Sequence, residues 1–333
     1  MLALTGAEIR ELVPMRDAIE LMKSVFAANS RGETISPLRT PVNMPDGSGV
    51  VLFMPAYVPP SATAPAATGA KIVSVFAGNR DIGLPTINAI VVTVDPATGQ
   101  PLGLLEGATI TALRTGAVSG AATDLLARQD SSILAIIGAG AQGVTQAVAV
   151  CAVRDIIEIR VSDLGEAARA NFAERLGAWA PELAERVRPV ASAREAVEGA
   201  DVICTATTAT SAVFDDGWLK PGAHINGIGA YTPEMQEIPD ETVARARIVV
   251  DEVNAVLHEA GDLVQPIGRG VITEAAIKIE LGHIVDGITI GRENAQQITF
   301  FKSVGNAIQD MIVSAAALKA AEARGVGLQL SLD

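Results

Sequence analysis

Three glycines near the middle of the chain constrain its fold more than any other feature. Gly138, Gly140 and Gly143 have the spacing G-x-G-x-x-G, directly after the apolar run 133–137 and before the alanine- and valine-rich run 144–153. Glycine permits a tight turn and lets backbone approach a pyrophosphate, and the start of the following helix offers free N–H groups. The pattern therefore predicts a strand, a turn and a helix of the kind that binds a dinucleotide.

The segments after this turn continue the alternation of strands and helices. A strand is expected over 156–161, a helix over 166–176, and further strands near Val187, Val202 and Ile248. Such alternation is typical of a parallel, doubly wound α/β sheet, that is, a Rossmann-type fold.

The acid that would bind a ribose stands close to its expected place. Asp163 follows the second strand at an offset near the roughly 20 residues of dinucleotide-binding units. Its carboxylate can accept from ribose hydroxyls and would repel a 2′-phosphate, and Leu164 and Gly165 supply no arginine. NAD(H) is therefore favoured over NADP(H). A turn without ligand, or one for S-adenosylmethionine or flavin, remains an alternative.

Several further residues are candidates for contact with such a cofactor. Ala141 and Gln142 lie between the second and third glycines, at the start of the predicted helix. Thr205 and Thr207 follow the strand at Val202 and could line the ribose, or they could simply form a loop.

The N-terminal third has a different pattern. Extended runs over 49–58, 69–79 and 88–107 are separated by turn residues and predict an antiparallel or mixed sheet. Small residues at helical spacing over 108–127 predict a closely packed helix, and 306–323 predicts another.

Composition excludes several classes of protein. The formal net charge is -13, so no basic field would gather nucleic acid or anionic lipid. Charged residues occupy the N-terminus where a signal peptide needs an apolar stretch, and glycines and glutamine argue against 131–153 as a membrane span. Cys151 and Cys204 lack zinc spacing, and the three histidines have no metal-ligand spacing. The expectation is a cytoplasmic protein without metal.

Three cations lie in the apolar N-terminal third. Lys71 alternates with valines along a predicted strand, Arg114 is surrounded by Thr, Gly and Ala, and Arg39 follows a proline. Each could be a structural ion pair, with Glu106 or Asp95 as the available acid. Together they favour a pocket for a carboxylate, which arginine binds in a bidentate manner.

At this level of detail the chain resembles the ornithine cyclodeaminase/mu-crystallin family. The likeness covers nearly the whole chain and is carried by five segments: "GAKIVSVFAGNRDIGLPTINAIVVTVDPATGQPLGLLEGATITALRTGAVSGAATDLLAR", "IIGAGAQG", "HINGIGAYTPEMQEIPD", "IVVDE" and "FKSVGNAIQD".

The resemblance implies a domain organisation and an assembly. A dimerisation and substrate domain would comprise 1–118 with 304–333, as an α+β domain completed by the C-terminal helix. The Rossmann domain would comprise 119–303. A homodimer is expected.

The resemblance also implies roles for single residues. Arg39, Lys71 and Arg114 match positions that hold the substrate's α-carboxylate and act next to the nicotinamide, and Thr86 matches another active-site position. Ile228, Gly229 and Ser303 match positions on the cofactor side.

The family includes NAD-dependent ornithine cyclodeaminases, alanine dehydrogenases, ketimine reductases and ligand-binding proteins without turnover. In the cyclodeaminases an aspartate thought to engage the amino groups of ornithine matches Tyr231. A phenol with a pKa near 10 cannot replace that carboxylate at neutral pH. The residue could close the pocket, pass a hydrogen bond or be a rim aromatic.

This departure favours an NAD(P)H-dependent reductase of a small imino acid, such as pyrroline-2-carboxylate, or an amino acid dehydrogenase. Arg114 and Arg39 would clamp the carboxylate. Lys71, with its pKa lowered by neighbouring cations and burial, would supply a proton. Ornithine cyclodeaminase and a non-catalytic binding protein are the alternatives.

Overall fold

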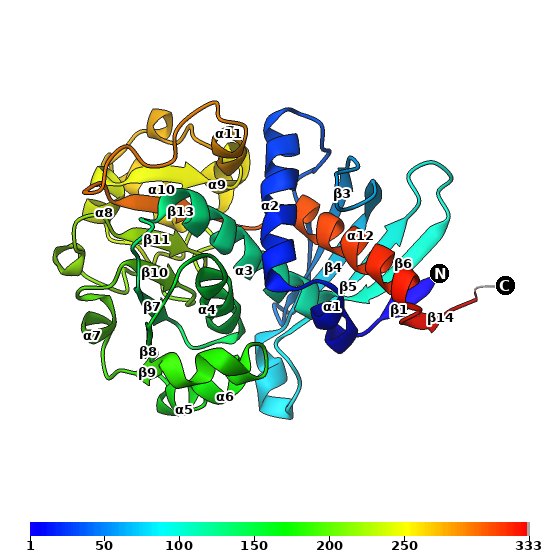
Figure 1. The fold of residues 1–333 in the computed structure, drawn as a ribbon, viewed down its shortest axis with the longest axis horizontal. Coiled ribbons are helices and arrows are strands. Elements are labelled where there is room, and N and C mark those ends of the chain that lie inside the picture. Colours follow the sequence, from blue (N-terminus) through cyan, green and yellow to red (C-terminus); the bar gives the residue numbers. More distant parts are fainter. Residues whose placement is uncertain (332–333) are drawn as a thin grey trace. The chain divides into compact units, whose positions relative to one another are not determined.

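The computed structural model describes residues 1–331, apart from the side chain of Arg80. The chain folds into two compact units, one comprising Met1–Arg114 with the segment from Asn306 onward, and the other comprising Thr115–Gly305 (Figure 1). The predicted domain boundaries, 118/119 and 303/304, remain predictions, and residues 332–333 of the first predicted domain lie outside the described part.

The first unit contains a seven-stranded sheet in the order β14-β1-β6-β5-β4-β3-β2. Strands β2 to β6 pair antiparallel in sequence order, as the turn residues predict, and β1 pairs parallel to β6. The strands are β1 (Leu2–Leu4), β2 (Thr40–Asn43), β3 (Val50–Val58), β4 (Ala67–Val75), β5 (Ile87–Val94), β6 (Pro101–Glu106) and β14 (Leu328–Gln329).

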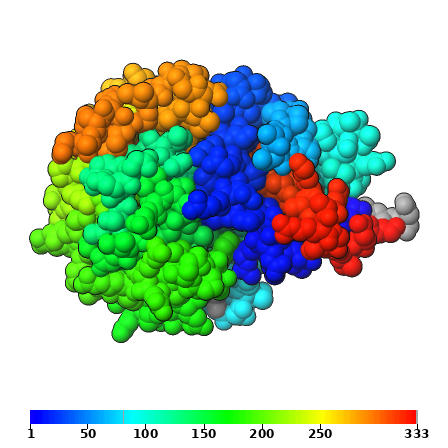
Figure 2. All heavy atoms as spheres, viewed as in Figure 1, coloured from blue at the N-terminus to red at the C-terminus, as the bar shows by residue number. Residues whose placement is uncertain are grey.

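One helix covers the middle of this sheet. Helix α12 (Ala307–Arg324) contacts β3, β4 and β5, and α1 (Gly6–Leu12) and α2 (Met15–Ser30) pack against it. β1 and β14 pair antiparallel, so segments from both ends of the sequence meet in this unit. In Figure 2, blue and red atoms lie next to one another. The predicted C-terminal helix is therefore part of the N-terminal unit, as expected.

The opposite face of the same sheet is apolar and largely open. Phe53, Ile72 and Ile90 lie directly across from one another on β3, β4 and β5. Residues opposite each other share a face, and Lys71, the neighbour of Ile72, points the other way. Phe53 is 39% and Ile90 is 44% exposed.

The second unit contains a seven-stranded sheet that is parallel throughout, in the order β12-β13-β11-β10-β7-β8-β9. The predicted doubly wound fold is thus confirmed, and its strand order reverses between β7 and β10. The strands are β7 (Ile133–Ile137), β8 (Glu158–Ser162), β9 (Val187–Pro189), β10 (Val202–Thr205), β11 (His224–Gly227), β12 (Arg247–Val250) and β13 (Thr299–Lys302).

The helices differ from the predicted ones mainly at their ends. Helix α3 (Gly107–Leu126) begins in the first unit and continues past Arg114. The helix predicted over 166–176 is two short helices that meet at Asn171. The helices of the second unit are α4 (Ala141–Val153), α5 (Glu166–Ala170), α6 (Phe172–Gly177), α7 (Ala193–Val197), α8 (Asp240–Arg245), α9 (Val253–Glu259), α10 (Gly261–Gly268) and α11 (Leu281–Val285).

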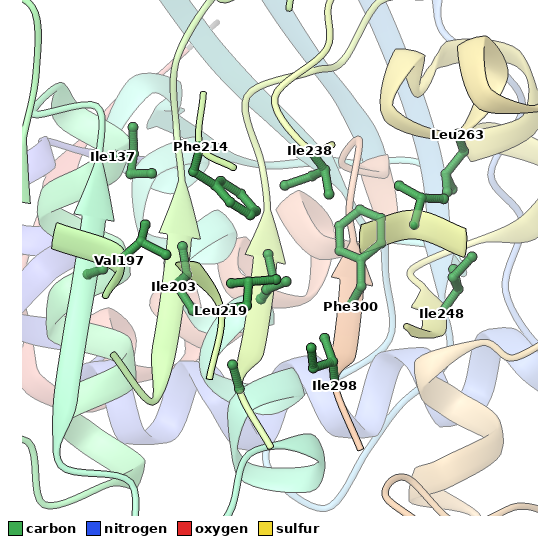
Figure 3. Packing of buried hydrophobic residues seen from close by; sticks show 14 of the residues in the cluster. Ile137, Val197, Ile203, Phe214, Leu219, Ile238, Ile248, Leu263, Ile298 and Phe300 are labelled. Carbon is green, nitrogen blue, oxygen red and sulfur yellow. The ribbon is translucent and has the colours of Figure 1, made fainter. Parts of the chain in front are cut away.

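A continuous apolar core holds the parallel sheet and its connections together. Ile203 and Phe300 project from β10 and β13, while Phe214 and Ile238 come from connecting segments and pack on the same face (Figure 3). This core fixes the strand ends from which the loops described below emerge.

Within residues 1–331, no helix combines the length and the apolar character needed to cross a membrane. The apolar run 131–153 instead forms β7, the glycine turn and α4.

Candidate functional site

The glycine turn has the geometry that its spacing predicts. Gly138 has a φ of +101°, and a Cβ there would lie 2.4 Å from the carbonyl oxygen of Ala206. A Cβ on Gly143 would lie 2.3 Å from the carbonyl oxygen of Gly138, so the start of α4 packs directly on the turn. Apart from Gly140 itself and the residues next to it in the chain, no atom of the described residues lies within 4 Å of a Cβ built on Gly140. The first and third glycines are thus required by the fold, whereas the second borders open space.

The start of α4 adds hydrogen-bond donors to this space. Gly140 is the N-cap, and Ala141, Gln142 and Gly143 are the first residues of a 13-residue helix. Their N–H groups have no acceptor within the helix, and the helix dipole places partial positive charge at this end. An anionic group such as a pyrophosphate fits this donor set.

Asp163 lies beside the glycine turn, immediately after β8. Its carboxylate accepts hydrogen bonds from the N–H groups of Ala139 and Gly165, each at 2.7 Å. Asp163 therefore ties the end of β8 to the turn after β7, next to the point where the strand order reverses.

Two arginines near Asp163 were missed in the sequence. Arg169 donates to the carbonyl oxygen of Asp163, and Arg175 donates to that of Ala139. Leu164 and Gly165 supply no arginine, as the sequence indicates, but two arginines further along the chain lie beside Asp163. The residues lie on α5 and α6, and only the folding of these short helices brings them to the turn.

The loops after β10 and β11 are joined by a buried acid that was also missed. Thr205 and Thr207 donate their hydroxyls to the carboxylate of Glu237, at 2.8 and 2.7 Å. The N–H groups of Thr207 and Gly229 donate to it at 2.6 and 2.7 Å. The two threonine hydroxyls are therefore directed to Glu237, so the expectation that they line a ribose remains a proposal for this chain.

Two other predicted cofactor-side residues are held at the same edge of the sheet. Ile228 is buried, and its N–H donates to the carbonyl oxygen of Thr205 at 3.0 Å. The hydroxyl of Ser303, just after β13, donates to the carboxylate of Asp251 at 2.7 Å. Strands β10, β11 and β13 run in the same direction, so these residues lie at the same carboxyl edge as the glycine turn.

The first unit contains a separate cluster of buried charges. The Nζ atom of Lys71 lies 2.7 Å from Oδ2 of Asp310, and Nε of Arg114 lies 3.1 Å from Oδ1 of the same carboxylate. Nη1 of Arg114 also donates to Oε1 of Gln309 at 2.9 Å. Lys71 is 1% exposed and Asp310 fully buried, so α12 brings its acid into the apolar face of β4.

The surroundings of Lys71 lower the pKa of its amine from 10.5 to about 7. Burial is the largest cause, and the charges of Arg114 and Arg39 act in the same direction. Asp310 acts in the opposite direction and raises the pKa of Lys71, which offsets part of the effect of burial. The predicted direction is confirmed, with burial outweighing the neighbouring cations.

For Lys71 and Arg114, the partner acids expected from the sequence are wrong, because both cations pair with Asp310. Glu106 accepts from the N–H groups of Ala108 and Thr109 at the start of α3. The Asp95 carboxylate accepts from two N–H groups in the turn between β5 and β6. Asp310 was missed, although a single acid in the apolar run after Asn306 marks it as a residue that needs a cation.

The remaining predicted substrate residues fall into both units. Arg39 is half-buried before β2, and Thr86, just before β5, accepts from the N–H of Phe76 at 2.9 Å with its carbonyl oxygen. Tyr231 follows β11 in the second unit and is 38% exposed.

Burial shifts the pKa values of His224 and of both cysteines. Burial lowers the pKa of His224 to about 3, and its ring bonds to Thr299 and Asn226 within the sheet. Burial raises the pKa of both Cys151 and Cys204 to about 12. No group of three potential ligands that could hold a metal is present in residues 1–331.

A cleft of about 690 Å³ in the second unit lies apart from these residues. Its walls come from the segment 210–217, from α8 and from Arg269 of the α10 end, and none of the predicted site residues lines it.

A doubly wound parallel sheet with a glycine turn at its switch point defines a Rossmann-type α/β protein. The first unit, in which a lysine and an arginine lie on one buried carboxylate, narrows the class of protein further. The chain belongs to the ornithine cyclodeaminase/mu-crystallin family, whose sequence profile matches residues 1–323.

Individual relatives match over nearly their full length. A Δ1-pyrroline-2-carboxylate reductase of Bacillus cereus is 40% identical over 332 residues, which is 98% of each chain. The structure of Thermococcus litoralis Δ1-pyrroline-2-carboxylate reductase in complex with NADH and L-proline has a TM-score of 0.92 at 41% identity, covering 99% of this chain and 100% of that one. An archaeal alanine dehydrogenase dimer with bound NAD has a TM-score of 0.89 at 32% identity, covering 100% and 99%.

The glycine geometry makes a prediction about stability. Gly138→Ala should lower the free energy of unfolding by about 3 kcal/mol, because a left-handed φ and a backbone clash must both be relieved. Gly140→Ala is the matched control and should unfold like the wild type in urea. Equal destabilisation by both changes would contradict the assignment of open space to Gly140.

Proposed function

We propose that this chain is an NADH-dependent reductase of small cyclic imino acids, with Δ1-pyrroline-2-carboxylate as the representative substrate. The observation that carries the proposal is the buried carboxylate of Asp310, which holds Lys71 and Arg114 side by side. The two relatives at 40% and 41% identity that are named for this reaction support the same substrate class.

The carboxyl edge of the parallel sheet fits a nicotinamide dinucleotide. Gly140 and the start of α4 would hold the pyrophosphate, because this turn combines donors with space. Asp163 would accept from the adenosine ribose, and the loops after β10 and β11 would hold the other half. Once bound, the dinucleotide would supply the hydride for the C=N carbon.

Arg114 is the residue we assign to the substrate carboxylate. Asp310 and Gln309 accept from Nε and Nη1, and among the described residues nothing accepts from Nη2. A guanidinium fixed at two positions presents the remaining donor in a defined direction, which is how arginine orients a carboxylate. Arg39, whose charge is felt at Lys71, would assist.

Lys71 is the residue we assign to proton transfer. An amine with a pKa of about 7 exists in both protonation states at neutral pH and can act as an acid toward the product nitrogen. Reduction needs the protonated form, so the rate should fall as pH rises through about 7. Asp310 keeps the amine in place in both states.

Tyr231 disfavours the cyclodeaminase alternative. An ornithine side chain carries a second ammonium, for which a neutral phenol is a poor counter-ion. Reduction of a substrate with a single nitrogen makes no such demand.

Steady-state assays with a small panel of substrates test this function. NADH should be consumed with Δ1-pyrroline-2-carboxylate or Δ1-piperideine-2-carboxylate, and ornithine with NAD⁺ should release no ammonia. Lys71→Met should lower kcat by roughly 100-fold or more while NADH still binds. Gly140→Ala should instead weaken NADH binding.

Two results would contradict the proposal. Consumption of NADH with none of the imines, nor with pyruvate and ammonia, would remove the reductase and leave a binding protein. Ammonia and proline from ornithine with catalytic NAD⁺ would establish the lyase.

We also propose that two copies associate through the open face of the first sheet. Exposed Phe53 and Ile90 flank Ile72 in a row across three strands, and contiguous apolar surface of this kind marks an interface. The archaeal alanine dehydrogenase, at 32% identity, is described as a dimer.

Mass measurement in solution tests the dimer. Ile90→Glu should convert a dimer to a monomer, because a charge in the middle of an apolar interface is costly to bury. Gln100→Glu, exposed in the turn between β5 and β6, is the control and should leave the mass unchanged. A wild-type monomer at micromolar concentration would overturn the proposal.

A further inference from the structure

Glu237 is a fully buried acid with an unusual set of contacts. Its carboxylate accepts four hydrogen bonds. Two come from the hydroxyls of Thr205 and Thr207, and two come from the N–H groups of Thr207 and Gly229. A Cβ on Gly229 would lie 2.6 Å from Oε1, so the carboxylate lies directly against the backbone after β11.

The neighbouring charges leave a net negative charge. Oδ1 of Asp262 accepts from the N–H of Glu237 at 2.6 Å, and its Oδ2 accepts from the Nζ of Lys302 at 2.9 Å. All three side chains are fully buried. With both acids ionised, the single lysine leaves a buried charge of minus one.

The hydrogen bonds favour the ionised form of Glu237. Burial is the largest influence on Glu237 and, with the charge of Asp262, raises its pKa above the usual value of a glutamate, while Lys302 and the bonds from Thr207 act in the opposite direction. Each carboxylate oxygen accepts from one backbone N–H, which can only donate, and from one threonine hydroxyl. Four donors on two oxygens match the capacity of a carboxylate.

The position of Glu237 in the sheet indicates which half of a dinucleotide would lie near it. Asp163 and the glycine turn belong to β7 and β8, the half that would take the adenosine. Thr205 ends β10 and Gly229 follows β11, on the other side of the switch point. In a two-half dinucleotide fold, the nicotinamide occupies this second half.

We propose that the buried charge of Glu237 favours the oxidised over the reduced nicotinamide and thereby tunes the cofactor toward hydride donation. The inference rests on the proposed cofactor. The oxidised ring carries a positive charge and the reduced ring is neutral, so a nearby negative charge in a poorly solvated region stabilises only the former. Glu237 acts through the two loops and through its field, without contact with the reacting atoms, and is a positioning residue.

The ratio of two dissociation constants tests this. Kd for NADH is measured by fluorescence, Kd for NAD⁺ by competition, and both for Glu237→Gln. The ratio Kd(NAD⁺)/Kd(NADH) should rise about tenfold, which for a two-electron couple corresponds to about 30 mV. A purely structural role would weaken both ligands together and leave the ratio unchanged.

Two further variants allow the test to be made even if Glu237→Gln does not fold. Asp262→Asn removes the other acid of the cluster and should raise the ratio in the same direction. Asp201→Asn is the matched control, because this buried carboxylate accepts from the N–H groups of Ser132 and Ile133 at the opposite, amino edge of the same sheet. Its ratio should equal that of the wild type.

The outcomes separate the two proposals. A ratio changed less than twofold in both Glu237→Gln and Asp262→Asn, with both ligands still bound, would overturn the inference and leave the function untouched. A wild-type protein that binds neither NADH nor NAD⁺ would overturn the proposed cofactor itself.

Discussion

One carboxylate organises the chemistry of the first unit. Asp310 enters an otherwise apolar contact between α12 and the sheet and holds Lys71 and Arg114 on its two oxygens. Removing one partner of such a buried group costs several kcal/mol, roughly 3 to 5 in measured cases, because the remaining charge is left unpaired. The same contact keeps Lys71 partly protonated where burial alone would release its proton. Packing and reactivity therefore depend on the same interaction.

The second unit uses a buried acid in a different way. Among the described residues no cation forms an ion pair with Glu237, whose carboxylate accepts from four donors at the end of β10 and in the loops after β10 and β11. Those loops follow neighbouring parallel strands, so the acid sets their spacing at the edge where the dinucleotide is proposed to bind. In the first unit, Asp310 balances the positive charges of Lys71 and Arg114. In the second unit, Glu237 is proposed to provide the negative charge that acts on the cofactor.

The sequence predicted the parts of this protein that depend on local pattern. The glycine turn, the alternating strands and the buried environment of Lys71 follow from spacing and periodicity, and the structure bears them out. Asp310, 196 residues from Arg114, and Glu237, 30 residues from Thr207, could not be assigned to their partners because only tertiary folding brings them together. The sequence pointed to acids nearby in the chain, such as Glu106, which instead caps the start of α3 by accepting from the N–H of Ala108.

The acid–base state of Lys71 tests the central claim most directly. Its side-chain amine can be titrated by NMR in the intact protein, with Lys71→Met to assign the signal. The account predicts a midpoint near pH 7, and a lower one in Asp310→Asn, where the stabilising charge is lost. A midpoint near the ordinary 10.5 of lysine, unmoved by Asp310→Asn, would contradict it.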